Sequence, residues 1–194
     1  MSDDSAPDSV MDKVDINRAA GAWQAFDEAA VRAAAAGAFG LLRGRQLLAG
    51  PAELSVLLSD DEAIRDLNKK YRGKDRPTNV LSFPASSPPP PPESEDGARL
   101  LGDIALAHET IAREAAEHHK PFVAHLSHLV VHGLLHLLGF DHEQGAADAA
   151  AMEALERDIM SALGFPDPYR EVCEPTYKET IAGVAAKGDV KAGL

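Results

Sequence analysis

The chain carries three histidines whose spacing could hold a metal ion. In the stretch HGLLHLLGFDH they are His132, His136 and His142, and Gly139 lies between the last two. The same ligand spacing occurs in the zinc-protease motif HExxHxxGxxH, where two histidines share one helical face and the third follows a turn. The glutamate that serves as general base in that motif is absent, because Gly133 occupies its position. The stretch therefore predicts a zinc site that lacks the proton acceptor of a peptidase.

The helix expected over residues 121–138 is apolar except along one side. At about 100° per residue, its four histidines fall within one narrow arc of that helix: His125, His128, His132 and His136. A core helix with a single stray histidine is common, whereas an all-histidine stripe is not. The stripe therefore favours a metal site over a buried polar network without metal.

Two pairs within this stripe are four residues apart and could each converge on one ion, namely His128 with His132 and His132 with His136. We prefer the second pair, because only this pair suits a helix end at Gly139 and a return of the chain at His142. Three imidazoles leave the fourth zinc position for water, which is the catalytic pattern.

Three further residues near this motif have open roles. His125 and His128 lie on the same side of the helix and could contact substrate or simply face water. Asp141 could orient a ligand histidine or only cap a turn.

The composition indicates one cytoplasmic domain. The chain has 194 residues, a net charge of −12 and one cysteine, Cys173, so no internal disulfide is expected. No apolar stretch has the length of a membrane span, and the acidic first residues do not predict a signal peptide. We expect a disordered acidic tail over residues 1–11, a single catalytic domain over 12–170 with a proline-rich loop at 86–98, and a loose tail over 171–194.

The hydrophobic patterns predict an α+β fold, with a small mixed sheet of about four strands packed with helices and the histidine helix buried at its centre. Gly37, Gly40 and Gly44 are expected to break or fray the second half of the first helix, and Gly73 to end the second helix. Strands are expected over residues 12–18, 53–60, 79–85 and 100–107, and helices over 20–48, 62–71, 108–120, 121–138 and 146–163.

A basic run follows the second predicted strand, although the whole chain is acidic. The stretch RDLNKKYRGKDR holds six basic and two acidic residues. Such a run is usually a solvated helix end, but an anionic substrate would require a patch of this kind.

These stretches resemble the YbeY family of metal-dependent endoribonucleases. The resemblance rests on the histidine motif and on YRGKDRPTNVLSFP, LGDIALA, HLSHLVVHG and MEALERDIMSALGFPDPY, in the same order over roughly residues 52–170. It implies one zinc ion on His132, His136 and His142 and a functional arginine at Arg72. It also implies cleavage of single-stranded RNA, processing of small-subunit ribosomal RNA, ribosome quality control, and ribosomal proteins or assembly factors as partners.

The missing glutamate matters less for a phosphodiester than for a peptide bond. Zinc can lower the pKa of a bound water from 15.7 to about 7, and the remaining need is for cations that stabilise charge on phosphate oxygens. Arg72 suits that role because a guanidinium binds phosphate in a bidentate manner, although it could also be an ordinary cation at a helix end. Asp103 could face the site or only turn a strand end.

Two rival hypotheses accompany this interpretation. The first is an unusual zinc peptidase, and the second is a ribosome-assembly factor that uses zinc only for structure. Whether water or the RNA 2′-hydroxyl is the nucleophile is left open by the residues.

Overall fold

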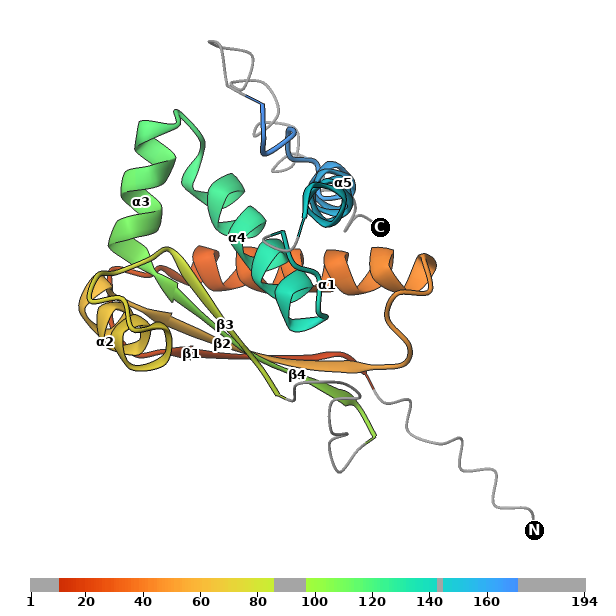
Figure 1. The fold of residues 1–194 in the computed structure, drawn as a ribbon, viewed down its shortest axis with the longest axis horizontal. Helices are drawn as coiled ribbons and strands as arrows, with labels where there is room; N and C mark the ends of the chain where they lie inside the picture. The colour runs from red at the N-terminus through yellow and green to blue at the C-terminus, as the bar shows by residue number, and fades with distance from the viewer. Residues whose placement is uncertain (1–10, 86–96, 143–144, 171–194) are drawn as a thin grey trace, which may run out of the picture.

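The computed structural model describes residues 11–85, 97–142 and 145–170 (Figure 1). The tails predicted over residues 1–11 and 171–194 lie outside these ranges, except for Met11, as does most of the loop predicted over 86–98. Ala98, at the end of that loop, is described and is buried. None of the described helices is long and apolar enough to cross a membrane.

Four strands form one sheet in the order β1-β2-β4-β3. Strands β1 (Lys13–Arg18), β2 (Ala52–Ser59) and β4 (Arg99–Ala107) run parallel to one another, and β3 (Val80–Pro84) is antiparallel to β4 at the edge. The predicted mixed sheet of about four strands, and with it the α+β class, is confirmed.

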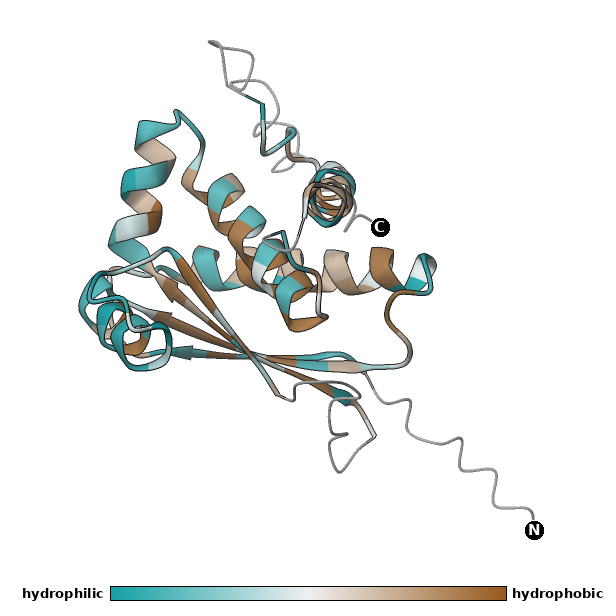
Figure 2. Ribbon diagram, in the orientation of Figure 1, coloured by the Kyte–Doolittle hydropathy of each residue, from teal (hydrophilic) through white to brown (hydrophobic). Residues whose placement is uncertain are grey.

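Helices α1 (Ala25–Gly44), α3 (His108–Glu117), α4 (Phe122–Leu137) and α5 (Ala146–Ala162) lie on one side of the sheet (Figure 1). Helix α4 is central, as predicted, because it contacts the sheet and each of the other three. The apolar colouring of α4 and of the strands marks the core between these layers (Figure 2).

Helix α2 (Asp61–Arg72) packs on the opposite face of the sheet through a small apolar cluster of its own. It begins at the N-cap Asp60, whose side chain accepts a hydrogen bond from the backbone of Ala63 at 2.9 Å. It ends at Gly73, which has the left-handed φ of +69° that was expected of a C-terminal glycine.

The prediction that Gly37 and Gly40 break or fray α1 was wrong, because this helix is continuous to Gly44, where it ends before the expected residue 48. A Cβ at Gly37 would lie 2.6 Å from Leu163 Cδ2, after the end of α5. Gly37 therefore allows close packing against the α5 end, and packing outweighs the low helix propensity of glycine.

Gly133, at the position of the missing glutamate, faces the sheet. A Cβ there would lie 3.0 Å from Ile104 Cδ1 and 3.1 Å from Ser82 Oγ. The Ser82 hydroxyl also donates a hydrogen bond of 3.2 Å to the Gly133 carbonyl. A small residue is thus required for α4 to approach β3 and β4.

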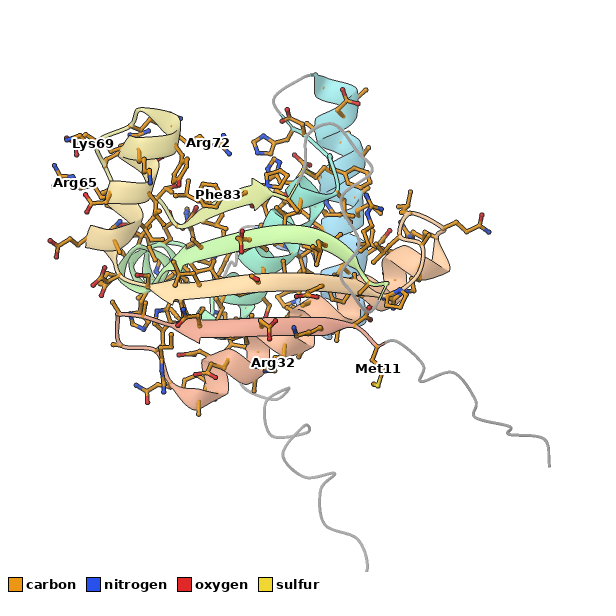
Figure 3. All side chains as sticks on the ribbon, turned by 90° about the horizontal axis from the view of Figure 1, so that it is seen from below. Met11, Arg32, Arg65, Lys69, Arg72 and Phe83 are labelled. Atoms are coloured by element: carbon orange, nitrogen blue, oxygen red, sulfur yellow. The ribbon has the colours of Figure 1, made fainter. Side chains whose placement is uncertain are left out.

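Asp103 does not enter the histidine site. It is exposed on β4, where Phe83 is its partner across the ladder, and the neighbouring Ile104 points to α4. With Arg32 and Tyr71 it lines a hollow on the face that Figure 3 shows from below. The expectation that Asp103 faces the histidine site is therefore wrong.

Candidate metal centre

The three histidines of the motif lie together in the structure. One ring nitrogen from each of His132, His136 and His142 lies within 4.8 Å of the others. Leu138 ends α4, and Gly139 follows with a φ of +92°, which turns the chain so that His142 returns beneath the helix. The turn expected from the sequence is the one that forms, and its left-handed conformation is one that glycine adopts readily.

A buried carboxylate sets the orientation of His132. Glu156 from α5 is fully buried, and its Oε1 lies 2.7 Å from His132 Nδ1. Burial would raise the pKa of Glu156, but hydrogen bonds from His128 and His132 outweigh it and lower the pKa to about 2. Because an ionised carboxylate only accepts hydrogen bonds, His132 Nδ1 carries the proton, and its Nε2 is left with a lone pair toward His136.

The other two histidines of the stripe bind carboxylates through Nε2. His125 Nε2 lies 2.8 Å from Glu114 Oε2, and His128 Nε2 lies 3.3 Å from Glu156 Oε2. His125 is 8% exposed, so this side chain is largely buried and does not simply face water. The pair His128 and His132 therefore shares a carboxylate and does not converge on one point.

The surroundings of His136 favour its neutral form. Burial, together with the neighbouring His132 and His142, lowers the pKa of His136 below its ordinary value. Neutral imidazole is the form that binds a metal ion. Three imidazoles, one of them oriented by a carboxylate on its far nitrogen, are a donor set that suits Zn²⁺, so the residues present fit the ion that the sequence predicts.

A hollow of about 660 Å³ connects these histidines to the loop between α2 and β3. We call it the cationic hollow, because its lining includes Arg72, Lys74, Arg76 and Arg113. Arg72 is the last residue of α2 and extends toward the centre of the molecule, away from Arg65 and Lys69 (Figure 3). The hollow therefore places cations beside the three imidazoles.

The basic run is divided between two environments. Arg65 and Lys69 lie 2.6 Å and 2.8 Å from the two carboxylate oxygens of Asp75, and they do not line the cationic hollow. Hydrogen bonds from Lys69 and Arg65 lower the pKa of Asp75 to about 2. The C-terminal part of the run, with Arg72, Lys74 and Arg76, lines the cationic hollow instead. Asp141 also lines the hollow, and its two expected roles both remain open.

Sequence reasoning missed the carboxylates Glu114 and Glu156. Glu156 had a signal, because it shares a helical face with Met152, Ile159 and Met160, all of which are buried. A charged residue at a core position of an amphipathic helix indicates a buried partner. Glu114 had a weaker signal, because its neighbours on the helix mix apolar Ile111 and Ala115 with polar residues.

Comparisons with known proteins show what this chain is similar to. A family model described as "Endoribonuclease YbeY" matches residues 19–164. A relative of that name from Bradyrhizobium sp. is 57% identical over 122 residues, which cover 63% of this chain and 72% of the relative. Another from Parvibaculum lavamentivorans is 51% identical over 161 residues, covering 81% and 84%. A solution structure from Thermotoga maritima has a TM-score of 0.52 at 23% identity, covering 81% of this chain and 99% of that one, and shows the fold alone.

Proposed function

The chain belongs to the YbeY family, and we propose that it is a zinc-dependent endoribonuclease that cleaves single-stranded RNA. We assign it to the maturation of small-subunit ribosomal RNA and to ribosome quality control in the cytoplasm, with ribosomal proteins or assembly factors as partners. The observation that carries the proposal is one hollow that holds both the three-imidazole group and a row of cations.

In this proposal His132, His136 and His142 hold one Zn²⁺ ion. When bound, the ion supplies a Lewis acid and a water of lowered pKa. Glu156 keeps the proton of His132 on Nδ1, so that Nε2 is available as a donor atom. The protein's own contribution to the ligand set is therefore a fixed tautomer.

Arg72 is proposed to bind the scissile phosphate. A guanidinium matches two phosphate oxygens with parallel N–H donors and stabilises the negative charge that gathers there during cleavage. Lys74 and Arg76 line the same hollow and would bind neighbouring phosphates of the strand. RNA binding is thus compatible with the acidic net charge of the chain, because four positive residues line the hollow where the RNA backbone would lie.

The peptidase alternative loses support at Gly133. The position that carries the general base in the protease motif points at Ile104 and Ser82 instead of at the three imidazoles. A carboxylate at that position would be directed into the core, so the general base of the protease motif has no counterpart at Gly133.

The test is RNA cleavage by wild-type protein and by Arg72→Ala, with metal content measured on the same preparations. We expect about one zinc ion per chain in both proteins and a loss in cleavage rate on the order of 10²–10³ for the variant. Arg72→Lys should recover part of the rate, because lysine keeps the charge but not the bidentate geometry.

Arg65→Ala is the matched control, since it removes an arginine of the same helix that binds Asp75 outside the hollow. Its cleavage rate should stay near wild type. Wild-type cleavage by Arg72→Ala would remove Arg72 from the proposal. A protein that needs zinc to fold but cleaves no RNA would favour the assembly-factor alternative.

A further inference from the structure

A second hollow, of about 600 Å³, adjoins the first at the histidine group. The two share part of their lining, including Asn79, Glu114, His132 and His142. From this junction the second hollow extends between α3, α4 and α5. A strand whose phosphate lies at the histidines would therefore have both hollows within reach.

The chemistry of the second hollow differs from that of the first. Its only lysine or arginine among the described residues is Lys120, whose Nζ donates a hydrogen bond of 2.6 Å to the Pro168 carbonyl. Rings and apolar side chains form much of the wall, and we call it the ring hollow. The lining includes His118, His125, His128, Leu129, Met152 and Tyr169.

Tyr169 is a fixed but accessible ring in this hollow. It makes an edge-to-face contact with the His128 ring, with 5.6 Å between centroids, and the Arg157 guanidinium lies 5.1 Å from its centroid. Its hydroxyl donates a hydrogen bond to Glu156, and yet the residue is 44% exposed. An aromatic ring that is held in place and still open to solvent is suited to stacking with a planar group.

Glu114 supplies an acceptor between the two hollows. Its Oε2 accepts hydrogen bonds from His125 Nε2 at 2.8 Å and from Asn79 Nδ2 at 2.9 Å. Burial would raise the pKa of Glu114, but these hydrogen bonds lower it below its ordinary value. The carboxylate therefore remains an acceptor, and it suits a planar ligand whose edge carries N–H donors.

We propose that the ring hollow binds one unpaired nucleobase of the RNA strand, next to the phosphate held in the cationic hollow. This inference rests on the proposed function and adds a base-binding site to it. Stacking on Tyr169 is tolerant of base identity, and the N–H groups of the base edge meet Glu114. A base in a duplex is stacked and paired, so it could not enter, which gives a physical reason for a preference for single strands.

The test compares a short single-stranded RNA, which has one cleavage site, with copies in which one nucleotide beside that site is abasic. Binding is measured by fluorescence anisotropy and cleavage as kcat/KM, for wild-type protein, Tyr169→Ala and Tyr169→Phe. At one position the abasic copy should bind wild-type protein about tenfold more weakly. Tyr169→Ala should bind intact RNA about tenfold more weakly and lose nothing further with the abasic copy, because both changes remove the same contact.

The matched control is Tyr71→Ala, which removes a tyrosine of similar exposure on the opposite face of the sheet. Tyr169→Phe should behave like wild type toward the abasic copy, since the ring remains. Equal binding of intact and abasic RNA at every position, or additive losses in Tyr169→Ala, would overturn the base site. Base-dependent binding without any cleavage would instead contradict the proposed function and leave the base site standing.

Discussion

Helix α4 carries two pairs of histidines that are alike in the sequence and different in the structure. His125 and His128 both direct Nε2 to a carboxylate, whereas His132 directs Nδ1 to one and keeps Nε2 for His136. All four lie on one side of the same helix. The difference teaches that a histidine keeps Nε2 free for a metal ion when the carboxylate faces its Nδ1, and does not when the carboxylate faces Nε2.

The same carboxylate produces both outcomes at neighbouring positions. Glu156 accepts from His128 Nε2 through one oxygen and from His132 Nδ1 through the other. A buried carboxylate with two imidazole partners therefore occupies Nε2 of His128 and leaves Nε2 of His132 free to face His136. Spacing within α4 does not distinguish these histidines, because both are separated by four residues from a second one.

The largest effect should come from removing one of the three proposed metal ligands, His132, His136 and His142. His136→Ala should lower zinc affinity by more than about 100-fold, beyond the effect expected of a residue that only orients a ligand, and abolish RNA cleavage. Zinc content after dialysis and cleavage rate are the measurements. His128→Gln, in the other pair, should retain about one zinc ion per chain. Loss of zinc in His128→Gln with retention in His136→Ala would reverse the comparison.

Gly133 lies on the opposite side of α4 from the histidines and faces the sheet. Gly133→Glu restores the protease-like motif but would force a charged side chain against Ile104 and Ser82. We expect a loss of more than about 4 kcal/mol in the free energy of unfolding, measured by urea denaturation. Gly40→Glu is the control, since a Cβ at Gly40 meets no atom within 4 Å. A stable Gly133→Glu protein with peptidase activity would contradict this interpretation.

Glu156→Gln tests the tautomer directly. The amide removes the negative charge that keeps the proton of His132 on Nδ1, so zinc affinity should fall by about 10- to 100-fold while the ligands remain. Competition with a chelator of known affinity measures the change. The control is Asp158→Asn on the same helix, because Asp158 is exposed and pairs with Arg45. Unchanged zinc affinity in Glu156→Gln would show that the carboxylate contributes only to packing.

The smallest effect should be the pH dependence of stability that Glu114 contributes as the partner of His125. Its pKa in the folded protein lies below its ordinary value, so its stabilisation is present above about pH 4.5 and is lost as the pH falls through the folded pKa. Glu114→Gln should flatten this part of the stability profile, measured by urea denaturation of zinc-free protein between pH 3 and 6. A profile as steep as that of wild type would assign the acid sensitivity to other carboxylates.

The sequence by itself determined the features that depend on local geometry. The helical period placed four histidines on one side of α4, and the glycines at Gly73 and Gly139 ended two helices in left-handed conformations. Alternating and continuous apolar runs located the four strands to within one or two residues. These properties follow from the backbone and from near neighbours in the chain, and so they can be read without knowing the fold.

Only the tertiary structure decided which histidine nitrogen meets a carboxylate and which residues share a hollow. Glu156 contacts the stripe from α5, and Arg72 lines the hollow beside it from α2, a helix on the opposite face of the sheet. Gly37 and Gly133, which helix propensity alone disfavours, are required by contacts with Leu163 and with the sheet. Such choices depend on how separate elements pack, because burial and hydrogen bonding between distant segments outweigh local preference.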